Sequence, residues 1–216
     1  MKQKLLFLFI AIAPAILHAQ SSRKGWYGDI GLGYGFYRLD LYNYNGGSPT
    51  YADQKYAAPM VWLGGEKKSV FQKNNFVLDA GGTIKAGFGV TTKSIASGPT
   101  SQKNNNGWLI GIEGTAKAGY LLQSKYVEII PLVGAGPYFL SIQTGKGDTD
   151  GFSSQLYGAQ GYIGADLRFN KITLTPQFHF GIASWGGSDR GIGRADNVQN
   201  SQPSMLEAGF KVAFQF

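Results

Sequence analysis

Apolar and polar residues alternate along most of this chain, and the alternation reaches its last residue. The segment 205–216, "MLEAGFKVAFQF", puts an apolar residue at every second position: Leu206, Ala208, Phe210, Val212, Phe214 and Phe216. A period of two is typical of a β-strand whose two faces meet different surroundings. Because chain ends usually fray and carry soluble residues, a strand that remains apolar up to its final Phe is expected to pair with another strand.

The same pattern predicts seven more strands. Six segments alternate clearly, at 26–38, 76–92, 108–122, 127–142, 156–169 and 172–185. Residues 57–66, "AAPMVWLGGE", form the weakest segment, with Trp62 as its only strong anchor. In the segment 76–92 the apolar face is predicted to run from Phe76 to Val90, with Gly89 on the other face. Eight strands of this kind predict an all-β fold.

The connections between these segments differ in length. Long polar loops are predicted at 42–55, 93–107 and 186–203, a medium one at 143–154, and shorter turns at 67–75, 123–125 and 170–171. A two-residue hairpin at Asn170 and Lys171 would set Phe169 opposite Ile172, so that apolar meets apolar. The chain is therefore predicted to form an eight-stranded antiparallel up-and-down transmembrane β-barrel, with both ends at the short-turn side.

Alternation alone does not decide which face is inside, because a soluble barrel also alternates. The non-apolar face is rich in glycine, which a water-facing surface would not need, and glycine accounts for 32 of 216 residues. An eight-stranded interior is narrow, so small residues there leave room for large polar ones. We therefore predict a filled lumen with a structural network of ion pairs, made of Asp79, Lys85, Glu113, Lys117, Glu128, Asp166, Arg168, Glu207 and Lys211.

Aromatic residues gather near both ends of the predicted strands. Two girdles at two bilayer interfaces are typical of outer-membrane barrels. A strand of about 10 residues, at about 3.3 Å each and a tilt near 45°, covers roughly the 25 Å apolar band of such a barrel. The predicted girdles are Trp26, Phe76, Tyr120 and Phe169 with Phe214 and Phe216 at the short-turn end, and Tyr34, Phe36, Trp108, Phe139 and Tyr157 at the loop end.

The first residues predict export. "MKQKLLFLFIAIAPAILHA" has two lysines, a short apolar run and small residues before Ala19, as a secretory signal peptide does. Residues 1–19 are therefore assigned to the signal peptide and 20–216 to the barrel. The chain has no cysteine, which excludes a disulfide scaffold. Its formal charge of +7 is dispersed, which favours weak attraction to anionic lipid or polysaccharide and not nucleic-acid binding.

As a pattern along its length, the chain resembles the small Gram-negative outer-membrane β-barrel family of the OmpA/OmpX type. The terminal strand carries the most specific part of this resemblance, with Phe210, Val212, Phe214 and Phe216. In that family a strand ending in Phe is read by the barrel-assembly machinery, so the resemblance implies an assembly signal here. It also implies a location in the bacterial outer membrane.

The sequence predicts no catalytic, cofactor-binding or metal site. His179, in "QFHFG", is similar to the His-x-Ser arrangement of outer-membrane lipid A deacylases only in part, since position 181 is Gly. It is interpreted as a structural histidine of the lumen. "GDTDG" at 147–151 lacks the spaced acidic ligands of a full calcium loop and is interpreted as a turn, with calcium as the alternative.

The predicted function is that of an integral, monomeric outer-membrane barrel with a filled polar lumen. Its role would be structural, or would lie in surface binding through the loops. Its expected partners are outer-membrane lipid, lipopolysaccharide and, during biogenesis, the assembly machinery. The alternatives are a narrow channel or small-solute transporter and a lipid A-modifying enzyme. The basic residues expected in the loops are Lys55, Lys93, Lys103, Lys146, Arg190 and Arg194.

Overall fold

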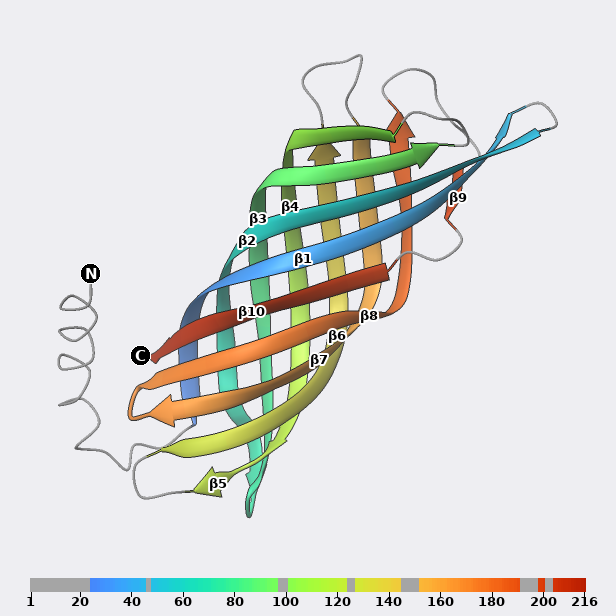
Figure 1. Cartoon of the computed structure of the whole chain (residues 1–216). Coiled ribbons are helices and arrows are strands. Elements are labelled where there is room, and N and C mark those ends of the chain that lie inside the picture. The colour runs from blue at the N-terminus through green and yellow to red at the C-terminus, as the bar shows by residue number, and fades with distance from the viewer. Residues whose placement is uncertain are drawn as a thin grey trace, which may run out of the picture.

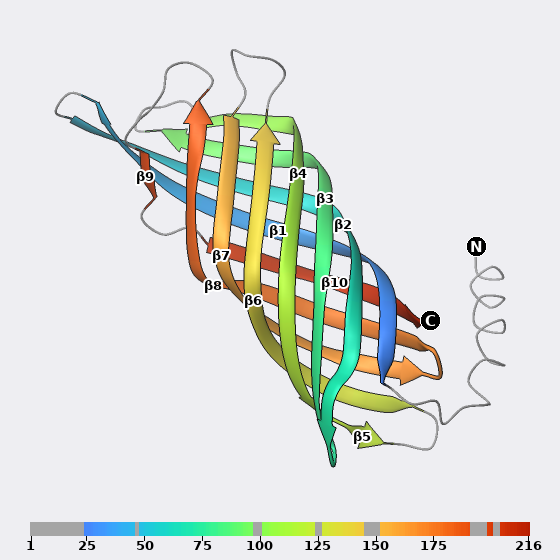
Figure 2. The same ribbon diagram turned by 180° about the vertical axis from the view of Figure 1, so that it is seen from behind.

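The computed structural model is a closed barrel (Figures 1 and 2). It describes residues 24–45, 48–96, 101–123, 127–144, 152–190, 198–200 and 204–216. The predicted signal peptide at 1–19 and the "GDTDG" segment at 147–151 lie outside these residues. Among the described residues, no helix is long and apolar enough to cross a bilayer.

Eight long strands make the barrel wall. In chain order they are β1 (Gly25–Asn45), β2 (Ser48–Lys73), β3 (Phe76–Ala96), β4 (Ser101–Tyr120), β6 (Glu128–Thr144), β7 (Phe152–Phe169), β8 (Ile172–Arg190) and β10 (Ser204–Gln215). Two short strands are added to them: β5 (Leu122–Gln123) pairs with β6, and β9 (Val198–Asn200) pairs with β1.

Each long strand pairs antiparallel with its neighbour in sequence, and β10 closes the barrel against β1. Tyr27 lies opposite Gln215, and Arg38 lies opposite Ser204 at the other end of this ladder. Beyond the ladder, the backbone N–H of Phe216 donates a hydrogen bond to the carbonyl oxygen of Trp26 at 3.3 Å. The predicted fold class is confirmed, and the final residue is held by the first strand.

The predicted hairpin register is also confirmed. Phe169 pairs with Ile172 across the turn at Asn170 and Lys171, and Arg168 pairs with Thr173. Asn170 has a φ of 58°, in the left-handed region that Asn tolerates better than most residues.

The strands are longer than the sequence pattern predicts. The predicted connections at 42–55, 67–75 and 93–107 are largely strand, and β8 and β9 cover residues 186–190 and 198–200 of the predicted loop at 186–203. The hairpin of β1 and β2 reaches beyond the rest of the wall (Figure 1). Alternation of apolar residues indicates a strand only where one face contacts lipid or a core. Strand segments outside the bilayer lack this pattern and are therefore not predicted.

One predicted side-chain orientation is wrong. Val90 was expected on the apolar outer face, but it is 0% exposed and packs inside the barrel. Gly89, expected inside, has a φ of 66° and lies where the pairing of β3 with β4 shifts register. Such a bulge adds a residue and reverses the alternation beyond it.

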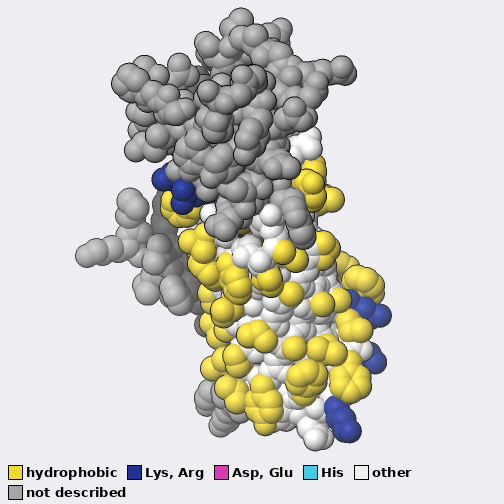
Figure 3. Space-filling model, turned by 90° about the vertical axis from the view of Figure 1, so that its right-hand side faces the viewer, with side chains coloured by type: hydrophobic (Ala, Val, Ile, Leu, Met, Phe, Trp, Pro, Cys, Tyr) yellow, Lys and Arg dark blue, Asp and Glu magenta, His cyan; other side chains and the backbone are white. Residues whose placement is uncertain are grey.

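The exterior wall is apolar and the interior is mixed. Side chains such as Leu32, Ile84 and Ile112 are exposed, whereas their neighbours in sequence point inward. On the face drawn in Figure 3, hydrophobic side chains cover the wall and Lys and Arg side chains lie at its edges. This arrangement matches the predicted assignment of faces: the alternating apolar residues form the outside of the barrel.

Candidate functional site

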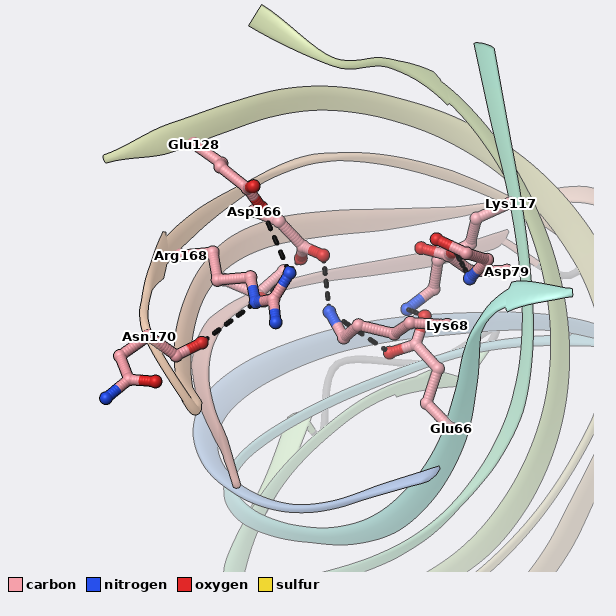
Figure 4. A network of polar contacts seen from close by, with 10 residues as sticks. Glu66, Lys68, Asp79, Lys117, Glu128, Asp166, Arg168 and Asn170 are labelled. Carbon is pink, nitrogen blue, oxygen red and sulfur yellow. Dashed lines mark hydrogen bonds and ion pairs between the residues drawn. The ribbon is translucent and has the colours of Figure 1, made fainter. Parts of the chain in front are cut away.

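Most of the charged side chains that the structure describes lie in the lumen. They form groups at successive positions along the barrel axis. Near the short-turn end, Lys68 from β2 bonds Asp166 from β7 across the interior. Glu66 lies 3.2 Å from Lys117 and 3.8 Å from Lys68, so one carboxylate faces two ammonium groups. Figure 4 shows this group of side chains pointing toward one another.

Two further contacts belong to the same group. Arg168 lies 3.1 Å from Glu128 and also donates to the backbone carbonyl of Asn170 at 3.0 Å, next to the hairpin turn (Figure 4). The backbone N–H of Ser69 donates to Asp79 at 2.8 Å. The side chain of Glu128 keeps 25% of its exposure, so this pair marks the short-turn mouth of the lumen.

A second ionic group occupies the middle of the barrel. Lys85 from β3 bonds both Glu113 from β4, at 2.6 Å, and Glu207 from β10. Three further partners complete the group. Tyr37 donates to Glu207 at 2.8 Å, Gln160 donates to Glu113 at 2.5 Å, and His179 Nδ1 lies 3.1 Å from Glu113.

A third pair lies beside this group. Lys211 from β10 is 3.1 Å from Asp29 of β1 and donates to the Thr83 hydroxyl at 2.6 Å. All these ionic side chains are buried, apart from the partly exposed Glu128. Charges removed from water must be paired and hydrogen-bonded to be tolerated, and the three groups supply such pairing between strands that are distant in sequence.

The loop-side half of the lumen is apolar, contrary to the expected polar interior. Its members share near-complete burial and form one cluster: Tyr37, Tyr56, Ala58, Met60, Trp62, Val90, Leu109, Tyr138, Leu140, Ile142, Leu156 and Met205. Trp62, the anchor of the weakest predicted strand, points inward with 0% exposure. Its indole ring covers Gly33 and Gly209, where any Cβ atom would collide with it.

The structure brings the predicted lumen residues together only in part. Lys85 contacts both Glu113 and Glu207, and Arg168 contacts Glu128. The remaining four have other partners. These pairs are Asp79 with Ser69, Lys117 with Glu66, Asp166 with Lys68, and Lys211 with Asp29.

Sequence reasoning missed Glu66 and Lys68 because both lie in β2. Gly64 and Gly65 interrupt the alternation there, and the pairing with β3 shifts register between Lys67 and Phe71. Ser69 has a φ of 51°, so Lys68 and Ser69 are buried in succession. The charged pair E-K at 66–68, spaced by two, was the available signal for a lumen-facing strand.

Glu113, His179 and Glu207 also have the composition of a metal site. Their ligand atoms lie within 4.8 Å of one another. The ammonium of Lys85 already bonds both carboxylates, however, and supplies the positive charge between them. The arrangement therefore acts as an internal ion-pair network, with His179 packed edge-on against Tyr162 at 5.2 Å.

The predicted girdle residues lie on the outer wall. Trp26, Phe76 and Tyr120 are exposed at the short-turn end, where Phe76 lies opposite Tyr120 across β3 and β4. Phe169, beside the hairpin turn, is half-buried. The aromatic residues exposed toward the loop end are Tyr34, Phe36, Trp108, Phe139 and Tyr157.

Comparison with solved structures agrees with this architecture. The outer membrane protein OprG from Pseudomonas aeruginosa matches with a TM-score of 0.51 and 13% identity, covering 92% of this chain and 100% of that one. The chain has the fold of a small outer-membrane β-barrel. Its closed wall and apolar exterior place it in the bacterial outer membrane.

Two other solved barrels are similar at lower scores. Neisserial surface protein A matches with a TM-score of 0.42 and 14% identity, covering 91% of this chain and 100% of its own. The outer membrane protease OmpT from Escherichia coli matches with a TM-score of 0.48 and 10% identity, over 93% and 100%. No protein-family model and no curated protein matches the sequence.

Proposed function

We propose that this barrel is a sealed, non-enzymatic component of the outer membrane, with a structural role in the envelope and a binding surface at its loop end. The observation that carries the proposal is the filling of the lumen. Two kinds of buried contact follow one another along its axis, the ionic groups around Glu66 and Lys85 and the apolar cluster around Trp62. Eight-stranded barrels have just enough interior for such side chains.

Energetics favour a plug over a channel. A continuous water path would have to separate Lys85 from its two carboxylates and also displace the apolar cluster. Breaking one buried ion pair costs about 3–5 kcal/mol when its partner stays buried. Such a water path would also have to break the ion pairs of Lys68 with Asp166 and of Lys117 with Glu66.

The lipid A-modifying alternative receives less support. His179, the residue that suggested it, is 1% exposed and contacts Glu113 in the lumen. A lipid substrate on the outer wall would be separated from it by the barrel backbone. The protease OmpT is only 10% identical in sequence, so its activity gives no support for an enzymatic role here.

Two basic residues support a binding role at the loop end. Arg38 on β1 lies opposite Lys55 on β2, and both side chains are exposed on the outer wall next to the aromatic pair Tyr34 and Phe36. Guanidinium and ammonium groups at a bilayer interface suit lipopolysaccharide phosphates. We propose this pair as a contact with that lipid.

Conductance in a planar bilayer tests the sealed lumen. The purified full chain should insert without stepwise current, whereas a large porin in the same membrane shows regular steps. Uniform, reproducible single-channel steps from the wild-type chain would contradict the proposal and favour the narrow-channel alternative. Replacing Trp62 by Ala, which removes the largest fully buried side chain, should raise leakage above the wild-type level.

A further inference from the structure

Charges are sorted between the inside and the outside of this barrel. Every carboxylate among the described side chains points inward and is buried or half-buried: Asp29, Glu66, Asp79, Glu113, Glu128, Asp166 and Glu207. The described charged side chains outside the lumen are cations, namely Lys24, Arg38, Lys55, Lys67, Lys73 and Lys171. The outer surface of this part of the chain is therefore positive at both rims, which attracts anionic groups.

Gln215 and Phe216 bond the backbone at two of these lysines and at Trp26, on the short-turn rim. The backbone N–H of Gln215 donates to the carbonyl oxygen of Lys171 at 2.9 Å, and its side-chain amide donates to that of Lys24 at 3.4 Å. Phe216 bonds the backbone of Trp26 in the same place. The backbones of Lys24, of the β7–β8 turn and of the residues that end β10 thus meet at one point of the rim.

A third lysine belongs to this point. Lys67 on β2 lies opposite Trp26 on β1, and its ammonium is 5.5 Å from the centre of the indole ring. The contact is a cation–π pair. Trp26 is 56% exposed and faces outward, as an aromatic residue at a bilayer interface does. The rim therefore combines three cations with exposed aromatic rings of Trp26 and Phe216.

We propose that Lys24, Lys67 and Lys171, with Trp26 and Phe216, form a binding site for the headgroup of an anionic phospholipid in the periplasmic leaflet. The ammonium groups would hold the phosphate, and the two rings would lie along the upper acyl chains. The short turns face the periplasm in barrels of this kind, which sets the leaflet.

This site goes beyond the sealed-barrel role and does not depend on the lumen. A conducting barrel could still bind the lipid, and a sealed one could lack the site, so failure of either proposal is distinguishable from failure of the other. Near an anionic membrane surface each lysine contributes about 1 kcal/mol, which corresponds to roughly a fivefold change in affinity.

Native mass spectrometry of the full chain with titrated lipids tests the site. Dioleoyl phosphatidylglycerol and dioleoyl phosphatidylcholine have the same acyl chains and differ in headgroup charge. The wild type should retain phosphatidylglycerol at least tenfold better than phosphatidylcholine. In the triple variant Lys24→Gln, Lys67→Gln, Lys171→Gln this preference should disappear, and addition of 0.5 M ammonium acetate should weaken it in the wild type.

A control removes a cation from the same rim outside the site. The variant Lys73→Gln, at the exposed tip of the β2–β3 hairpin, should keep the wild-type preference for phosphatidylglycerol, and heat-modifiable gel migration verifies that all variants are folded. The proposal is overturned if the wild type shows no headgroup preference. It is equally overturned if the triple variant retains the full preference, or if the Lys73→Gln variant loses it instead.

Discussion

At the scale of single residues, Lys85 is the side chain on which the centre of the lumen depends. Its ammonium is buried between Glu113 and Glu207, which come from strands on different parts of the wall. Its removal would leave both carboxylates without their cation, and an uncompensated buried charge is among the most costly defects in a protein.

The variant Lys85→Met is therefore expected to lower the free energy of unfolding by about 3–5 kcal/mol. Urea unfolding of the barrel refolded in phosphatidylcholine vesicles measures this change. The double variant Lys85→Met, Glu207→Gln should recover part of the loss because one buried charge is removed with its partner. Lys67→Met, on the outer wall, is the control and should cost less than about 1 kcal/mol. An equal, small cost for Lys85→Met would contradict the described network.

The sequence identifies which charges face inward but not which of them meet. Alternation predicts the inward orientation of Asp166 and Lys117, and the structure places both inside. Their partners Lys68 and Glu66 lie across the lumen on β2, at a separation of 98 and 51 residues. Pairing across a closed barrel depends on strand tilt and stagger, which a local pattern does not contain.

At the scale of the elements, the strand that closes the barrel is the most informative. β10 pairs with β1 over its whole length and with β8 on its other side, so its two edges are both covered. An unpaired edge in lipid would expose backbone groups at several kcal/mol each. The terminal Phe216 is 85% exposed outside the barrel, which leaves its ring accessible to a partner such as the proposed assembly machinery.

Phe216→Ser is expected to slow assembly into the outer membrane without changing the stability of the folded barrel. Pulse-chase labelling with heat-modifiable migration as the readout measures the rate. Phe76→Ser, at the same rim but outside the last strand, is the control and should assemble at the wild-type rate. Unchanged assembly of the Phe216 variant would reject the terminal strand as the assembly signal.

Elements were predicted well where lipid and lumen face opposite sides of a strand. The hairpin at Asn170 has its predicted register, whereas β2, predicted as the weakest strand, spans 26 residues. Its glycines and the bulge near Ser69 interrupt the alternation. Val90 is misplaced for the same reason, since the bulge at Gly89 reverses the faces beyond it.

At the scale of the whole molecule, the described structure separates an apolar exterior from an interior that is apolar toward the loops and ionic toward the short turns, where a smaller apolar cluster of Val77, Ile130, Leu132 and Tyr162 lies among the charges. The sequence predicts the inward orientation of the charged side chains, because they alternate with apolar residues. The apolar half was not predicted, because apolar residues occupy both faces of segments such as "WLI" at 108–110 and "FLSI" at 139–142. There Leu109, Leu140 and Ile142 point inward. Their orientation can be predicted only from the alternation along the rest of the strand.

The central claim is that the alternating apolar side chains contact lipid while their neighbours are enclosed, and spin labelling along β4 tests it most directly. The chain has no cysteine, so single substitutions from 109 to 113 each give one labelled site in lipid vesicles. Labels at Ile110 and Ile112 should collide often with oxygen and rarely with a water-soluble nickel complex, and labels at Leu109, Gly111 and Glu113 should collide little with oxygen. Strong nickel collisions at Ile110 and Ile112, or the opposite alternation, would contradict the account.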